Sequence, residues 1–156
     1  MKRIAVFPGT FDPFTIGHES IVLRALPLFE KIYIAIGVNI TKKGYFPLEK
    51  RMEWINIVFE NEPKIEVVNF SGLTVNFCKK INANYIIRGL RTSSDFEYER
   101  AIGQLNRSLD TNIETIFTLT RPEHTFINST VVRDIIINGE DASRFLPEKL
   151  KNIKFL

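Results

Sequence analysis

Short apolar runs alternate along the chain with longer stretches in which apolar residues recur every three or four positions. The runs are nearly continuous rows of Ile, Val, Ala and Phe, which is typical of strands covered on both faces of a sheet. They predict strands at Arg3–Phe7, Lys31–Gly37, Ile65–Phe70, Tyr85–Arg88 and Glu114–Leu119. The longer stretches predict helices at Gly17–Leu28, Leu48–Phe59, Thr74–Ile81, Asp95–Leu109 and Ser129–Asn138, followed by a short helix from Pro147.

This alternation predicts an α/β protein with a doubly wound, five-stranded parallel sheet, because parallel strands are joined by right-handed crossovers through helices. The 156 residues contain no linker, repeat or low-complexity segment, so we expect one domain that spans residues 1–156. In such sheets, ligands bind at the carboxyl ends of the strands, near the point where the strand order reverses. The longest expected loops, Val38–Pro47 and Thr120–Asn128, are candidates for mobile flaps.

The first strand leads into the first helix through the segment Phe7-Pro-Gly-Thr-Phe-Asp-Pro-Phe-Thr-Ile-Gly-His18. Pro8 and Gly9 are turn residues, and we expect them to end the strand. Thr15 is placed to cap the helix, whose free N–H groups attract phosphate. His18 then either stabilises charge on a bound phosphate or satisfies the helix end, and spacing alone leaves both readings open.

The composition is that of an ordinary soluble protein, with 44% hydrophobic and 25% charged residues. The 21 basic and 18 acidic residues give a net charge of +3, and the basic residues come in scattered pairs, which argues against a nucleic-acid surface. No apolar run is long enough for a membrane span, and the N-terminus has no signal-peptide pattern. The single cysteine, Cys78, excludes an intramolecular disulfide, fits a cytoplasmic protein, and is expected to be buried.

Arg88 is a candidate anion-binding residue because it ends an apolar run. Gly89 after it is expected to let the chain turn sharply out of the sheet. A partly buried cation at a sheet edge needs an anion, which is either a ligand or a carboxylate of the next helix. The candidate carboxylates are Asp95, Glu97 and Glu99.

Two further segments offer groups for phosphate. Lys42 lies in a polar loop, where most lysines are simply solvated. Asn128, Ser129 and Thr130 are all residue types that cap helices, and the free amides beside them suit a phosphate as well as an ordinary helix start.

Three separated motifs together are far more specific than any one of them. They are Pro-Gly-Thr-Phe-Asp-Pro with Thr15-Ile-Gly-His18, then Ile87-Arg-Gly-Leu-Arg91 with Asp95-Phe-Glu-Tyr-Glu99, and finally Phe126-Ile-Asn-Ser-Thr130. In this order they resemble the nucleotidyltransferases related to class I aminoacyl-tRNA synthetases and, within them, the bacterial phosphopantetheine adenylyltransferase family. The resemblance runs from Lys2 to about Pro147. It implies a Rossmann-like nucleotidyltransferase fold and transfer of adenylyl from ATP to 4′-phosphopantetheine, the penultimate step of coenzyme A biosynthesis, with dephospho-coenzyme A and pyrophosphate as products.

The resemblance also implies roles for individual residues. Catalysis falls to His18, as a transition-state stabiliser, and to Lys42 and Arg91. Binding of the acceptor falls to Thr10, Lys42, Thr74 and Arg88. Binding of ATP falls to Thr10, Phe11, His18, Gly89, Leu90, Arg91, Glu99, His124, Thr125, Phe126, Ile127, Asn128, Ser129 and Thr130. The family usually has Ile-Ser-Ser-Ser where this chain has Ile127-Asn-Ser-Thr, so Asn128 keeps an acceptor and gains amide donors, while Thr130 keeps its hydroxyl.

The same resemblance implies Mg²⁺ as a cofactor bridging substrate phosphates, with no protein metal ligand, and a homohexamer with feedback by coenzyme A. Two alternatives stay open from the residues. One is a sister nucleotidyltransferase with another phosphate acceptor, such as nicotinamide mononucleotide or a phospho-alcohol. The other is a non-enzymatic module that binds a nucleotide.

Overall fold

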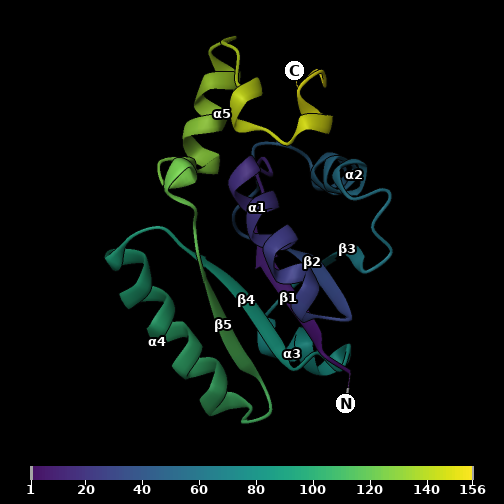
Figure 1. Ribbon diagram of the computed structural model, residues 1–156, viewed down its shortest axis with the longest axis vertical. Coiled ribbons are helices and arrows are strands. Elements are labelled where there is room, and N and C mark those ends of the chain that lie inside the picture. Colours follow the sequence, from purple (N-terminus) through teal and green to yellow (C-terminus); the bar gives the residue numbers. More distant parts are fainter. Residues whose placement is uncertain (1, 156) are drawn as a thin grey trace.

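The computed structural model describes residues 2–155 of the chain. Within them, five parallel strands form one sheet: β1 (Ile4–Gly9), β2 (Lys31–Gly37), β3 (Ile65–Phe70), β4 (Tyr85–Leu90) and β5 (Glu114–Leu119). The strand order is β3-β2-β1-β4-β5, so the winding reverses between β1 and β4 (Figure 1). The predicted α/β class with a doubly wound parallel sheet is therefore confirmed.

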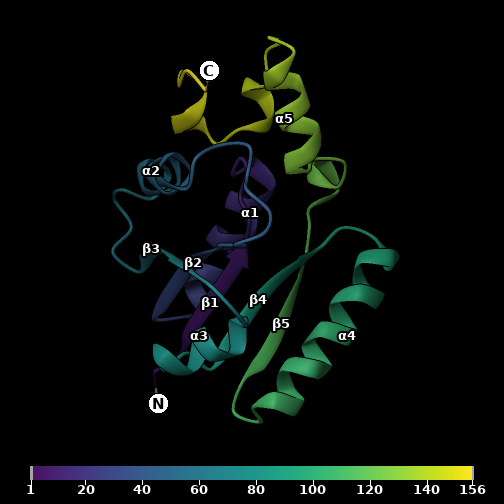
Figure 2. The ribbon, with the colours of Figure 1, turned by 180° about the vertical axis from the view of Figure 1, so that it is seen from behind.

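Helices cover both faces of the sheet. They are α1 (Ile16–Ala25), α2 (Leu48–Val58), α3 (Thr74–Lys80), α4 (Ser93–Leu109) and α5 (Ser129–Ile137). The buried side chains of α1, α2 and α5 join one core cluster, while those of α3 join the other, on the face seen in front in Figure 2. Helix α4 packs on the α3 face, because its Phe96 contacts Phe117 of β5.

The two core clusters follow from the pleat of the strands, which sends successive side chains to opposite faces. In β1, Ala5 and Phe7 point to the α1 face and Val6 points to the α3 face. Cys78 of α3 is fully buried beside Val6, and burial raises the pKa of its thiol to about 12. The expectation of a buried cysteine is confirmed.

Most element boundaries match the pattern-based prediction, but two strands are longer than expected. β1 continues through Pro8 and Gly9, and β4 continues through Gly89 to Leu90. The prediction that Pro8 and Gly9 break the strand was wrong. Pro8 is tolerated because β1 pairs with β4 only at Ala5 and Val6, so the missing N–H of Pro8 falls where no ladder bond is needed.

Gly89 does not form a sharp exit, because it pairs with Thr118 inside the ladder between β4 and β5. A Cβ added at Gly89 would lie 2.2 Å from Cδ1 of Ile21, so this glycine lets α1 approach the sheet closely. Helix α1 ends at Ala25 and a tighter turn covers Leu26–Leu28, because Pro27 cannot donate a helical hydrogen bond. The helix expected from Pro147 is a single turn at Glu148–Leu150.

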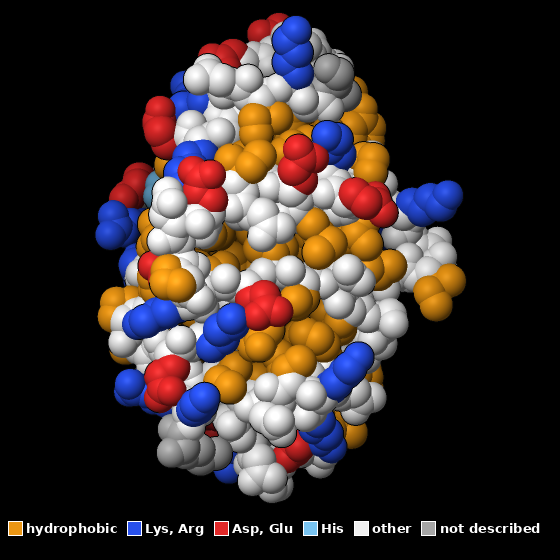
Figure 3. Space-filling model, turned by 90° about the vertical axis from the view of Figure 1, so that its right-hand side faces the viewer, with side chains coloured by type: hydrophobic (Ala, Val, Ile, Leu, Met, Phe, Trp, Pro, Cys, Tyr) orange, Lys and Arg blue, Asp and Glu red, His pale blue; other side chains and the backbone are white. Residues whose placement is uncertain are grey.

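The surface mixes charges of both signs. On the face drawn in Figure 3, lysine, arginine, aspartate and glutamate side chains are interspersed around apolar side chains. No helix within residues 2–155 is both long enough and apolar enough to cross a bilayer.

Candidate active site

Two cavities meet at the carboxyl edge of the sheet. The smaller, the His18 cavity, has a volume of about 290 Å³ and is lined by residues of β1, α1, β4, α4 and the segment before α5. The larger, the Lys42 cavity, has a volume of about 1560 Å³ and lies under the loop that follows β2. Thr10 and Ser129 line both, so the two cavities join between the turn after β1 and the start of α5.

His18 is held at the start of α1 by a reciprocal cap. The Thr15 hydroxyl accepts the backbone N–H of His18 at 3.4 Å, and Nδ1 of His18 accepts the backbone N–H of Thr15 at 3.0 Å. Thr15 thus caps the helix as predicted. Because Nδ1 is an acceptor, the neutral ring carries its proton on Nε2, which forms no hydrogen bond within residues 2–155. A donor is therefore available to a ligand in the His18 cavity.

The surroundings of His18 keep its ring neutral. Burial, reinforced by the positive charges of Arg91 and Arg88, lowers the pKa of His18 to about 4. Three aromatic rings contribute to that burial, with centroids 5.1 to 6.3 Å from the imidazole: Phe7, Phe11 and Phe14. His18 is therefore a neutral hydrogen-bond donor at pH 7 rather than a cation.

The turn that carries Thr10 has a strained backbone. Phe11 has φ of +47°, a left-handed conformation that is unfavourable for a bulky residue. Its ring is nevertheless buried between Phe7 and Phe14, with centroids 5.3 Å from each. Packing of the Phe11 ring against Phe7 and Phe14 thus holds the turn next to the cavity in this conformation.

Arg88 has a carboxylate partner on α4. Its Nε donates to Oε2 of Glu99 at 2.8 Å, its Nη2 donates to Oε1 of Glu99, and its Nη1 donates to the carbonyl of Pro8 at 2.9 Å. Of the carboxylates left open by the sequence, Glu99 is the one that pairs with it. A guanidinium has five N–H groups, so two remain for an anion in the His18 cavity, which both residues line.

Arg91 contributes a second cation to this cavity. It follows β4 directly, and its backbone N–H and Nε both donate to Oδ2 of Asp95, at 3.1 and 3.3 Å. Asp95 in turn donates its own backbone N–H to the Thr92 hydroxyl, the cap of α4. The capped first turn of α4 therefore fixes where Arg91 leaves the sheet.

The start of α5 closes the His18 cavity. The Asn128 side chain accepts the backbone N–H of Val131 at 2.9 Å, so the asparagine is a capping residue. The Ser129 hydroxyl donates to the carbonyl of Pro13 at 2.8 Å, which ties α5 to the turn after β1. His124 lines the same cavity, and its buried Nδ1 has no hydrogen-bond partner within residues 2–155.

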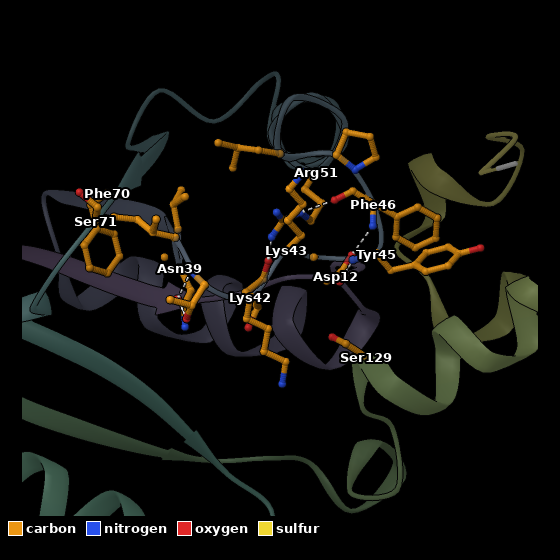
Figure 4. A pocket seen from close by; sticks show the side chains of 18 of the residues that line it. Asp12, Asn39, Lys42, Lys43, Tyr45, Phe46, Arg51, Phe70, Ser71 and Ser129 are labelled. Carbon is orange, nitrogen blue, oxygen red and sulfur yellow. Dashed lines mark hydrogen bonds between the residues drawn. The ribbon is translucent and has the colours of Figure 1, made fainter.

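The Lys42 cavity is covered by the loop of residues 38–47. Residues 38–43 are exposed, and the Lys42 side chain extends from them into the open space shown in Figure 4, as does Ser129 from α5. Thr130 lines this cavity, as do Ser71 and Gly72, which follow β3. The cavity therefore combines an exposed, cationic loop tip with the residues that follow the neighbouring strand β3.

Comparison with known proteins identifies the family of this chain. The sequence matches the Cytidylyltransferase-like family model over residues 6–135. A phosphopantetheine adenylyltransferase from Flavobacterium psychrophilum is 50% identical over 149 residues, which cover 96% of this chain and 98% of that protein. One from Bacteroides thetaiotaomicron is 48% identical with the same coverage. The chain belongs to the phosphopantetheine adenylyltransferase family.

Solved structures of other adenylyltransferases share the fold. A candidate nicotinate-nucleotide adenylyltransferase from Vibrio parahaemolyticus superposes with a TM-score of 0.70 over 94% of both chains, at 19% identity. A bifunctional NMN adenylyltransferase/ADP ribose pyrophosphatase from Francisella tularensis gives 0.69 over 94% of this chain and 45% of that one, at 20% identity. These likenesses support the nucleotidyltransferase fold of this phosphopantetheine adenylyltransferase-family chain.

Most residues implied by the family motifs meet at the two joined cavities. The His18 cavity is lined by Thr10, Phe11, His18, Arg88, Gly89, Arg91, Glu99, His124, Ile127, Asn128 and Ser129. The Lys42 cavity is lined by Thr10, Lys42, Ser129 and Thr130. Four implied residues line neither: Thr74, Leu90, Thr125 and Phe126.

Those four lie near the cavities in different ways. Thr74 begins α3, two residues after Gly72, and Leu90 is buried in the sheet. The Thr125 hydroxyl donates to the carbonyl of Pro122, while Phe126 is exposed and contacts Phe145.

Two arginines that line the Lys42 cavity were not predicted from the sequence: Arg51 and Arg133. A signal for Arg51 was present, because it stands three, four and seven residues before the buried Trp54, Ile55 and Val58. A charged residue at core spacing indicates a buried cation with a specific task. Its partners, 41 and 5 residues away, could not be read from the pattern.

Proposed function

We infer that this protein transfers the adenylyl group of ATP to 4′-phosphopantetheine and releases dephospho-coenzyme A and pyrophosphate. The names of full-length relatives with close to half of their residues identical support this inference. The observation that carries it is the convergence on one cavity of three separate parts of the chain, which contribute His18, the pair Arg88 and Arg91, and Ser129. Such a site gathers cations and free donors for two anionic reactants.

The reaction is an in-line displacement at phosphorus. A phosphate oxygen of the acceptor forms a bond to the α-phosphorus of ATP, and the bond from that phosphorus to the bridging oxygen breaks as pyrophosphate leaves. No covalent intermediate with the protein is needed. The protein holds the reactants in line, which can supply up to roughly 7–11 kcal/mol in favourable cases.

The residues divide this task by charge and position. The Nε2–H of neutral His18 donates to an oxygen of the α-phosphate as charge develops there, and one such donor is typically worth about 2.7–4 kcal/mol. Arg88 uses its two remaining N–H groups for the phosphate of phosphopantetheine, while Arg91 and the amides at the start of α5 bind the phosphates of ATP. Thr10, which lines both cavities, contacts both reactants, and Lys42 reaches the reacting phosphates from the larger cavity.

We propose Mg²⁺ as the cofactor. Residues 2–155 contain no group of three or more His, Cys, Asp or Glu side chains that could hold a metal ion. Such surroundings fit an ion carried by substrate phosphates and water rather than by a carboxylate cage. When bound in this way, Mg²⁺ offsets the negative charge of the phosphates.

The test of this function is pyrophosphate release from ATP with and without 4′-phosphopantetheine. We expect release only with the acceptor, and far less with nicotinamide mononucleotide or a simple phospho-alcohol. In the His18→Ala variant kcat should fall far more than either KM rises, because this donor acts in the transition state. ATP binding without pyrophosphate release would instead indicate a nucleotide-binding module.

We also propose that the chain forms a homohexamer in the cytoplasm and is inhibited by coenzyme A. Exposed apolar side chains on α4, Leu105 and Leu109 among them, support burial of that surface in an assembly. Light scattering should give a mass six times the 18.0 kDa of one chain, and a monomeric mass would overturn the proposal. Coenzyme A should inhibit pyrophosphate release in competition with phosphopantetheine.

A further inference from the structure

Arg51 of α2 is a buried cation that bridges two segments of backbone. Its side chain is only slightly exposed, its Nη1 donates to the carbonyl of Thr10 at 2.6 Å, and its Nε donates to the carbonyl of Phe46 at 3.0 Å. It forms no ion pair with any carboxylate of residues 2–155, unlike Arg88. A buried charge is costly, and the two backbone carbonyls offset that cost while they hold the guanidinium against both segments.

The segments that Arg51 joins are the ones that carry Thr10 and Lys42. Figure 4 shows its side chain reaching from α2 toward the end of the loop, while the Lys42 side chain extends away from it. Residues 38–43 of the loop are exposed, whereas Phe46 is buried. The loop therefore has an anchored end and a free tip, and Lys42 is on the tip.

The anchored end is held from a second side by Asp12, two residues after Thr10. Its carboxylate accepts the backbone N–H groups of Tyr45 and Phe46 at 2.7 and 2.9 Å. Arg133 of α5 donates to the backbone carbonyl of Asp12 at 2.8 Å, which completes the contact with α5. The turn after β1 and the end of the loop are thus joined by a carboxylate that accepts hydrogen bonds and by a guanidinium that donates them.

Gly44 fits closely against this cluster. A Cβ added to it would lie 2.9 Å from Nη2 of Arg51 and 3.2 Å from Oδ2 of Asp12. Only a residue without a side chain lets the loop pass at this distance. Beyond it, the Phe46 ring packs against Trp54, with centroids 5.0 Å apart, so the same anchor continues into the core.

We propose that Arg51 is a positioning residue for adenylyl transfer, which sets the separation between Thr10 and the loop that carries Lys42. The proposal rests on the function inferred above. Arg51 does not touch the reacting atoms; it acts through Thr10, which lines both cavities, and through the loop that carries Lys42. Its guanidinium suits the task because a rigid planar fork can hold two carbonyls at a fixed distance, which a lysine cannot do.

The first test does not depend on activity. Trypsin cleaves after exposed lysines, and Lys42-Lys43 lies on the loop tip. In Arg51→Gln, cleavage at this site should be at least about tenfold faster than in the wild type, since opening of the loop is no longer opposed by two charge-assisted hydrogen bonds. Acrylamide quenching of the fluorescence of the single tryptophan, Trp54, should also increase, because the Phe46 ring no longer covers the Trp54 ring when the loop opens. The matched control is Lys50→Gln, which removes an exposed charge from the same helix.

The second test separates positioning from general damage. In Arg51→Gln and Arg51→Lys, kcat should fall by about tenfold to a hundredfold with less than about threefold change in KM for ATP, because a small displacement of a catalytic group affects the transition state most. In a Lys42→Ala background, the same Arg51→Gln change should lower kcat by less than about threefold. Should Arg51→Gln fold poorly, Gly44→Ala tests the same contact from the loop side and should show the same cleavage and kcat changes.

The outcomes are distinct. Unchanged cleavage at Lys42-Lys43 in Arg51→Gln overturns the proposal, and so does full activity in Arg51→Lys. Equal losses of kcat with and without Lys42 also overturn it, because they indicate a structural effect that does not pass through the loop. If the wild type releases no pyrophosphate, the proposed function fails while the cleavage and quenching results still decide whether Arg51 anchors the loop.

Discussion

The pair formed by Arg88 and Glu99 makes a quantitative prediction about stability. Glu99 is 7% exposed, and both of its carboxylate oxygens accept from Arg88, whose side chain is 30% exposed. Glu99→Gln keeps the shape of the side chain but removes its charge and one of its two acceptors. The buried side chain at position 99 then accepts only one hydrogen bond from Arg88, while water from the His18 cavity can hydrate part of the Arg88 guanidinium.

The magnitude follows from the two hydrogen bonds. Each bond to a charged group is worth about 1.5–3 kcal/mol, which gives roughly 3–6 kcal/mol if both were lost completely. Glutamine retains one acceptor and water reaches Arg88, so we expect a loss of about 2–3 kcal/mol in the free energy of unfolding. For a domain of this size, that loss lowers Tm by roughly 5–10 °C.

The assay is urea denaturation of the wild type, Glu99→Gln, Arg88→Met and the double variant at one protein concentration. The double-mutant cycle should give a coupling energy above about 1 kcal/mol, because either single change leaves the other partner unsatisfied. The matched control is Glu97→Gln on the same helix. Glu97 is 66% exposed in its pair with Arg100, so its loss should cost under about 1 kcal/mol.

Two results would refute this reasoning. One is a loss in Glu99→Gln no larger than that in Glu97→Gln, which would mean that burial does not strengthen the pair. The other is additivity of the Glu99 and Arg88 changes, which would mean that the two side chains do not depend on each other.

Three further predictions concern His18, Gly89 and Asn128. Because the pKa of His18 is lowered to about 4, folding favours its neutral form; the stabilisation is present above pH 6.5 and is lost as the pH falls toward 4. An NMR titration of the two histidines should therefore find His18 neutral at pH 5.5, and a midpoint near 6.5 would contradict this. Gly89→Ala should destabilise the fold by about 1–3 kcal/mol because its Cβ would meet Cδ1 of Ile21, and Ile21→Val should recover part of the loss. Calorimetric melts that show no recovery would place the strain elsewhere. Asn128→Ala should cost about 1 kcal/mol and Asn128→Ser much less in urea denaturation, since serine also caps helices; equal losses would argue against a capping role.

Local patterns were sufficient to predict most of the fold. β2, β3 and β5 begin and end where their apolar runs do, and Thr15 caps α1 because its hydroxyl is three residues from the N–H it accepts. The convergence at one sheet edge followed from topology, since parallel strands present their carboxyl ends together.

The errors and omissions involve contacts between distant residues. Pro8 remains in β1 because its neighbouring ladder ends at Val6, and its carbonyl accepts from Arg88, 80 residues away. The lowered pKa of His18 depends first on its burial and then on the positive charges of Arg91 and Arg88, which are distant in the sequence. Arg51 bridges Thr10 and Phe46 across 41 and 5 residues. Each of these depends on tertiary geometry, which a single sequence shows only as a charged or turn residue at an unusual position.

The central position of β1 has a consequence for the chain as it leaves the ribosome. β1 is synthesised before the other four strands of the sheet, yet one of its two neighbours, β4, starts only at Tyr85. A nascent chain that has emerged only as far as α3 therefore presents the unpaired edge of an apolar strand at Ala5 and Val6. Pairing with β4 covers that edge once β4 has emerged. A pause in translation before then should therefore favour wrong strand pairing between nascent chains on the same messenger RNA.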